Sequence, residues 1–102
     1  MGFQDMLKQV QEVRERMQRL QEELGARSVE GSAGGGMVVA VVNGRQELLD
    51  LRIEKEVVDP GDVGMLRDLV RAAVNDALAR SREMAAAEMA KLTGGMLPPG
   101  IF

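Results

Sequence analysis

Apolar side chains near the start of the chain recur at alternating spacings of three and four residues, the heptad pattern of a helix that packs along a seam. The seam consists of Phe3, Met6, Val10, Val13, Met17, Leu20 and Leu24. It predicts a helix over about residues 3–24 that ends at Gly25. Three heptads are short for a free coiled coil, so the seam packs either on the chain's own core or against a partner helix.

The pattern changes at residue 28 to short, β-branched apolar stretches separated by glycine, which predicts a sheet over about residues 28–56. The dipeptide Asn43-Gly44 favours a two-residue hairpin turn. Such a turn directs one alternating set of residues toward the core, namely Val38, Ala40, Val42, Leu49, Leu51 and Ile53. The opposite face then carries an apolar strip that we expect to form a dimer contact, namely Met37, Val39, Val41 and Leu48.

A second helix is predicted over about residues 62–92, after the turn Asp59-Pro60-Gly61-Asp62, with the Asp62 side chain as its cap. Its apolar positions recur near the helical period, and they are Leu66, Leu69, Val70, Ala73, Val74, Ala77, Met84 and Leu92. Gly94-Gly95 ends the pattern. Residues 93–102 form an apolar tail that its prolines keep from continuing the helix, so it either docks or stays mobile.

The 102 residues suffice for a single domain, and their composition excludes most enzyme mechanisms. Histidine and cysteine are both absent, which removes imidazole bases, thiolate nucleophiles and the common zinc ligands. Gly34-Gly35-Gly36 precedes a strand and lacks the lysine that a phosphate-binding loop carries. We therefore expect no catalysis, no cofactor, no metal and no small-molecule substrate.

The chain shows no sign of a membrane segment. Its longest apolar run, Met37 to Val42, is far shorter than the roughly 20 residues that a spanning helix needs. The first residues carry neither a basic flank nor an apolar signal core. The expected location is cytoplasmic, with no membrane partner.

The charges are distributed unevenly, although the chain as a whole is acidic with a net charge of −3. Residues 28–62 contain three basic and seven acidic side chains, so a polyanion would have to meet the helices. The basic side chains of the two helices that we take as candidates for such contacts are Lys8, Arg14, Arg16, Arg19, Arg67, Arg71, Arg80, Arg82 and Lys91. The alternative is a solvated face with i,i+4 ion pairs such as Glu12 with Arg16.

Five sequence features in this order resemble the YbaB/EbfC family of bacterial nucleoid-associated proteins. They are the heptad helix, Gly34-Gly35-Gly36-Met37-Val38, Asn43-Gly44, Ala72-Ala73-Val74-Asn75-Asp76-Ala77, and Lys91-Leu92-Thr93-Gly94-Gly95 followed by Pro98-Pro99-Gly100. The likeness covers nearly the whole chain. It implies a bacterial α+β protein with an α-β-β-β-α protomer, a three-stranded antiparallel sheet and long terminal helices.

The resemblance also implies a function. It implies a tweezer-like homodimer whose helical arms hold double-stranded DNA, a location in the cytoplasm and the nucleoid, and a role in DNA organisation or transcription regulation. The alternative from another class is a dimeric helical-arm module that grips a protein or an unfolded chain. The methionines of the seam, Met6 and Met17, suit the adaptable apolar contacts of such a module.

Overall fold

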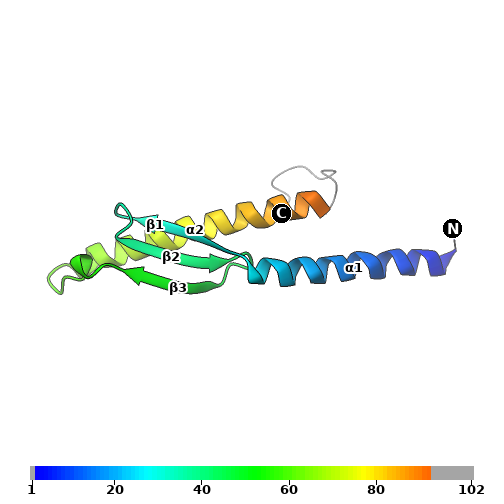
Figure 1. The fold of residues 1–102 in the computed structure, drawn as a ribbon, viewed down its shortest axis with the longest axis horizontal. Coiled ribbons are helices and arrows are strands. Elements are labelled where there is room, and N and C mark those ends of the chain that lie inside the picture. Colours follow the sequence, from blue (N-terminus) through cyan, green and yellow to red (C-terminus); the bar gives the residue numbers. More distant parts are fainter. Residues whose placement is uncertain (1, 93–102) are drawn as a thin grey trace.

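The structure is a computed structural model, and it describes residues 2–92. Two long helices enclose three strands in the chain order helix, three strands, helix, which confirms the predicted α-β-β-β-α protomer. The elements are α1 (Phe3–Ala26), β1 (Ser28–Ala33), β2 (Val38–Asn43), β3 (Leu48–Ile53), the 3₁₀ turn η1 (Lys55–Val57) and α2 (Val63–Leu92). In Figure 1, α2 lies along one face of the sheet while α1 leaves from its end. The predicted tail, residues 93–102, lies outside the described residues.

The sheet is antiparallel with the strand order β1-β2-β3. Its first connection uses Gly34, Gly35 and Gly36, which all have positive φ angles (64°, 67° and 91°). Residues that carry a side chain rarely adopt positive φ angles, so the turn between β1 and β2 depends on these three glycines. Their role in this turn is therefore conformational.

The second hairpin differs from the prediction. Val42 pairs with Leu48 and Val41 with Asp50, so the register shifts at this point and omits Leu49. Three residues form the turn, which is closed by the backbone N–H of Asn43 donating to the Glu47 carbonyl at 3.0 Å. The residue with positive φ is Gln46 (63°). The predicted two-residue turn is wrong: Asn43 stays paired with Glu47, and the left-handed residue lies at the third turn position, as is typical of a three-residue hairpin.

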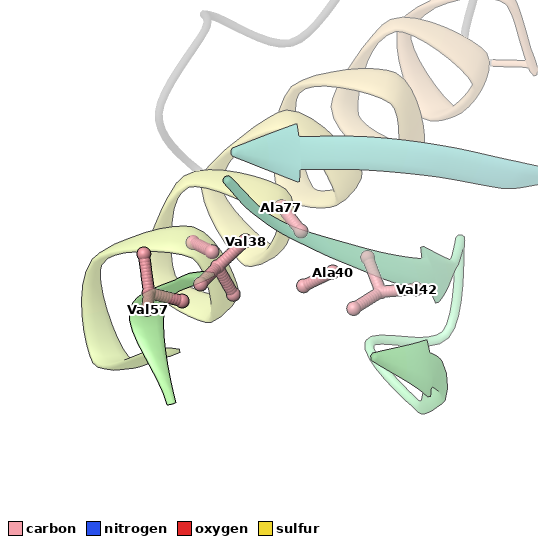
Figure 2. Packing of buried hydrophobic residues seen from close by; sticks show 6 residues of the cluster. Val38, Ala40, Val42, Val57 and Ala77 are labelled. Carbon is pink, nitrogen blue, oxygen red and sulfur yellow. The ribbon is translucent and has the colours of Figure 1, made fainter. Parts of the chain in front are cut away.

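The core lies between the sheet and α2. Val38, Ala40 and Val42 of β2 are fully buried against Ala73 and Ala77 of α2, as Figure 2 shows for most of this cluster. These assignments from the sequence are confirmed, and Leu51 packs partly buried against the same cluster.

Two of the predicted core residues are exposed. Leu49 and Ile53 of β3 remain 56% and 38% accessible. The reason is that α2 packs on β1 and β2, and one helix is too narrow to cover three strands. The prediction placed both residues in the core because the alternation of apolar residues along a strand does not show how many strands the helix covers.

The contact between β1 and α2 is unusually close. A Cβ added to Gly31 would lie 2.6 Å from the Ala77 Cα and 2.7 Å from the Ala73 carbonyl oxygen. No side chain fits there unless the helix shifts. Glycine on the strand and alanine on the helix therefore set the depth at which α2 sits on the sheet.

The molecule is elongated because α1 projects as an arm (Figure 1). Its extents are 70 × 23 × 16 Å and its radius of gyration is 18.9 Å, whereas a compact chain of this length has a radius of gyration of about 13 Å. Only the end of the heptad seam, Leu20 and Leu24, is buried, and the helix continues past Gly25 to Ala26. Within the described part of the chain, no helix is long and apolar enough to cross a membrane.

Candidate nucleic-acid interface

The arm is fixed at its base by hydrogen bonds to the β2-β3 turn. The carbonyl of Leu24 accepts from the backbone N–H groups of Arg27 and Gly44, at 3.3 and 2.8 Å. The side-chain amide of Asn43 donates to the Gly25 carbonyl at 3.2 Å. These bonds satisfy carbonyl groups that the end of a helix leaves free. Since a Cβ on Gly44 would lie 2.7 Å from the Leu24 carbonyl oxygen, this turn needs glycine for proximity.

Asn43 connects the arm base to α2 as well. Its side-chain oxygen accepts from the backbone N–H groups of Arg45 and Glu47, both at 3.0 Å. Its carbonyl accepts a bond of 2.7 Å from the buried hydroxyl of Ser81. The sequence reasoning missed Ser81, although Ala73, Ala77 and Ser81 follow each other at spacings of four along the buried stripe.

The four candidate cations of α1 are exposed and unpaired. They are Lys8, Arg14, Arg16 and Arg19. Among residues 2–92, no carboxylate lies at ion-pair distance from any of them, and the pairs Glu12 with Arg16 and Glu15 with Arg19 do not form. Their charges are therefore available to an anion from outside the chain.

The α2 candidates are mostly paired. The Asp68 carboxylate accepts from Arg67 at 3.3 Å and from Arg71 at 3.1 Å. Arg80 and Lys91 make ion pairs of 3.4 and 3.1 Å, with Asp76 and Glu88 respectively. In the described part of the chain, Arg82 has no such partner. Exposed pairs of this kind are weak, but each one lowers the net charge that α2 presents.

Three of the nine candidates come together in one cleft. Arg16 and Arg19 of α1 and Lys91 of α2 line it, with Leu20, Glu23, Glu88 and Leu92. Arg67 lies 24 positions before Lys91 on α2, about 36 Å away at the rise of an α-helix. A single protomer thus has one mixed cleft between its helices and a separate basic group at the start of α2.

An acidic residue organises the α2 side of this cleft. Glu88 accepts from Arg27 at 2.9 Å and from Lys91 at 3.1 Å. The Arg27 hydrogen bond, followed by that from Lys91, lowers the pKa of the Glu88 carboxyl group. Glu88 therefore stays ionised and holds Lys91 at the cleft. Its charge also offsets part of the attraction that Arg16 and Arg19 exert on an anion.

A similar carboxylate links the sheet to the middle of α2. Asp76 accepts from the backbone N–H of Ser32 at 3.0 Å, and this bond, with a further contribution from Arg80, lowers the pKa of Asp76. Within residues 2–92, no three acidic side chains gather as a metal site would require.

The residues predicted to form a dimer contact do not share one face. Val39 is half-buried and Val41 is buried on the side of the sheet away from α2. Glu30 and Arg52, which flank these valines on β1 and β3, form an ion pair of 3.2 Å across β2. Met37 packs against the core instead. Leu48 pairs with Val42, so the register shift separates it from Val39 and Val41.

The fold and its charges define a small α+β protein in which long helices, one of them projecting, carry most of the unpaired cations of the described residues. The chain belongs to the YbaB/EbfC DNA-binding family, whose sequence profile matches residues 1–96. This membership confirms the resemblance found in the sequence, and the family is one of nucleoid-associated DNA-binding proteins, not of enzymes.

Relatives support the assignment, and a solved structure shares the fold. A nucleoid-associated protein of Syntrophobacter fumaroxidans is 55% identical over 100 residues, covering 98% of this chain and 90% of the relative. One of Moorella thermoacetica is 56% identical over 95 residues, covering 93% and 91%. The crystal structure of an uncharacterized Helicobacter pylori protein has the same fold, with a TM-score of 0.67, 21% identity and coverage of 96% and 99%.

Proposed function

We propose that this protein binds double-stranded DNA as a homodimer, with its helical arms in contact with the phosphate backbone. The observation that carries the proposal is the set of four unpaired cations on α1, namely Lys8, Arg14, Arg16 and Arg19. Phosphates attract such side chains without regard to base sequence. In this proposal the protein acts in the cytoplasm, on the nucleoid, in DNA organisation or gene regulation.

The overall charge sets the expected strength of binding. The net charge of −3 and the acidic sheet segment repel DNA, while the arm attracts it. Affinity should therefore be modest and fall steeply with salt, because phosphate contacts release counterions. We assign the contacts first to α1 and to Lys91 in the shared cleft, and second to Arg67, Arg71, Arg80 and Arg82.

A homodimer would strengthen this arrangement. Two-fold symmetry doubles each cationic arm and fixes the spacing of the pair, so that one DNA molecule meets both arms. The proposed contact contains Val39 and Val41, whose face of the sheet α2 does not cover. The proposed contact leaves out Met37, which packs against the core, and Leu48, which pairs with Val42.

A second candidate function has one observation in its favour. Met6, Val10, Val13 and Met17 line an apolar groove on α1, together with Gln9 and Arg14. An apolar groove on a projecting helix suits a protein-interaction or chaperone-like module that grips a partner chain. Binding of this kind depends on apolar burial, so added salt would weaken it little.

A gel-shift titration at two salt concentrations separates the two functions. The DNA proposal expects affinity to fall at least tenfold between 50 and 200 mM salt for a few phosphate contacts, on the order of the effect known for such contacts. The variant Arg14→Ala/Arg16→Ala/Arg19→Ala should bind at least tenfold more weakly. The control Arg45→Ala/Arg52→Ala removes two cations of the sheet segment that pair with Glu47 and Glu30 and that the proposal leaves out of the contact, so it should bind nearly as well as the unmodified protein. Equal losses in both variants would remove α1 as the main contact.

A further inference from the structure

We propose that the apolar segment following α2, residues 93–102, docks in the apolar groove of α1. The DNA-binding proposal uses Arg14 beside this groove, but it uses neither the apolar side chains of the groove nor the segment. The inference therefore stands independently of it.

The groove is an exposed stretch of a seam that is buried only at Leu20 and Leu24. Its walls are Met6, Val10, Val13 and Met17, with Gln9 and Arg14 at the rim. Met6, Val10 and Val13 are 57%, 54% and 57% exposed, whereas Leu20 and Leu24 of the same seam are 7% and 2% exposed. Burial of this exposed apolar surface by another apolar segment would stabilise the folded protein.

The end of α2 lies close to the end of the groove on α1. Leu92, the last residue of α2, lines the same cleft as Arg16 and Leu20. The described part of α2 therefore ends in the same cleft as Leu20, which lies about one helical turn from Met17 along α1. Ten residues follow Leu92 and reach about 33 Å when extended. The distance along α1 from Leu20 to Met6 is about 21 Å, so the segment is long enough to follow the whole groove.

The chemistry of the segment matches the groove. It contains two apolar pairs, Met96-Leu97 and Ile101-Phe102, and no charged side chain. Pro98-Pro99 lies between them, and proline-rich segments lose little conformational entropy when they dock on an apolar surface. An uncharged occupant leaves the Arg14 guanidinium at the rim free for an anion.

A second copy of α1 is a weaker occupant for the same groove. Only the first half of the seam is exposed, which is less than two heptads, and helix pairs of that length are marginal in water. A segment on the same chain acts at an effective concentration in the millimolar range, so it occupies the groove ahead of a separate molecule. Docking then shields the apolar side of the arm, whereas Lys8 and Arg19 do not line the groove and stay available for other contacts.

A disulfide test uses the absence of natural cysteine in the chain. The double variant Val10→Cys/Ile101→Cys should oxidise at low micromolar concentration to an internally cross-linked product of one chain's mass. The matched control, Glu12→Cys/Ile101→Cys, places the first thiol on the exposed opposite side of α1 and should cross-link at least fivefold more slowly. Equal rates in the two variants would overturn the proposal.

The single variant Val10→Cys tests the rival occupant. If it forms covalent dimers as fast as the double variant forms its internal product, a second α1 covers the groove and the proposal is overturned. Deletion of residues 94–102 gives an independent readout. It should raise the fluorescence of a bound apolar dye at least twofold without weakening DNA binding, since no cation is removed. Unchanged dye fluorescence would overturn the docking, whereas DNA binding reports on the other proposal alone.

Discussion

The hydroxyl of Ser81 on α2 donates a hydrogen bond of 2.7 Å to the backbone carbonyl of Asn43 at the end of β2. Both residues are buried, at 0% and 4% exposure. Because the Asn43 side chain also bonds the Gly25 carbonyl at the end of α1, this residue connects both helices to one hairpin. The direction of the arm relative to α2 therefore depends on a small polar cluster, not on a broad apolar interface.

Replacing Ser81 with alanine should lower the free energy of unfolding by about 1 kcal/mol. The loss is modest because the Asn43 carbonyl keeps a second donor, the backbone N–H of Gln46 at 3.1 Å. Urea unfolding followed by circular dichroism measures it. The exposed Ser28→Ala serves as the control, and equal effects of the two substitutions would contradict the structural role of Ser81.

Replacing Gly31 with alanine should be more damaging, because its Cβ would overlap the backbone of α2 at Ala77. We expect a loss of about 1–3 kcal/mol, the range for overpacked cores, and a lower thermal midpoint. Gly64→Ala is the matched control, since the nearest atom to its added Cβ is a flexible Arg67 nitrogen at 3.7 Å. It should remain within about 1 kcal/mol of the unmodified protein. A neutral Gly31→Ala would mean that α2 does not sit at this depth.

The Asp76→Asn variant should show a stability difference that depends on pH. The hydrogen bond from the Ser32 backbone lowers the pKa of Asp76 in the folded protein. A group with a depressed folded pKa stabilises the protein above its unfolded pKa of about 3.9 and loses this effect as the pH falls through the folded value.

The measurement is chemical unfolding of both proteins between pH 7 and pH 2. The unmodified protein should be the more stable at neutral pH, and the gap should narrow below about pH 4. Since asparagine can still accept the Ser32 bond, the comparison isolates the charge. A gap that widens toward acid pH would contradict the assigned cause.

The proposed homodimer should dissociate when Val39 and Val41 are both replaced by lysine. Two charges buried in an apolar contact cost far more than the contact contributes. Each protomer should still fold, because Glu30 and Asp50 flank position 41 on the neighbouring strands. Sedimentation equilibrium measures the mass. Leu49→Lys, on the exposed edge of β3, is the control, and a dimer that this variant alone breaks would move the contact to β3.

The order and type of the elements could be predicted because the patterns are long and local. The heptad seam and the stripe of α2 each extend over many turns, so single deviations do not obscure them. The predicted cap of α2 is also confirmed, since the Asp62 carboxylate accepts a hydrogen bond from the Met65 backbone N–H at 3.1 Å.

The hairpin could not be predicted because its chemistry is not local. Asn43-Gly44 favours a two-residue turn in isolation. In the structure, Gly44 instead lies against Leu24, and Asn43 bonds the end of α1. These contacts join residues about 20 positions apart in the chain, and they override the preference of the dipeptide. The exposure of Leu49 and Ile53 has a similar origin, since it depends on where α2 lies.

The candidate cations illustrate a different limit. Their places on helix surfaces follow from the sequence, but their pairing does not, because side-chain geometry decides it. Asp68 pairs with Arg67 and Arg71, whereas Glu12 and Glu15 leave the cations one turn later unpaired. Arg16, Arg19 and Lys91 come together because of the angle between α1 and α2. This angle cannot be derived from the spacing of apolar residues in the sequence.

The projecting arm has a practical consequence for counting protomers. Friction in solution follows the dimensions of a particle, and an 11.1 kDa chain that extends 70 Å diffuses like a heavier sphere. In gel filtration a single chain would elute early enough to imitate a pair. Light scattering or native mass spectrometry, which read mass without reference to shape, is therefore the appropriate way to establish stoichiometry.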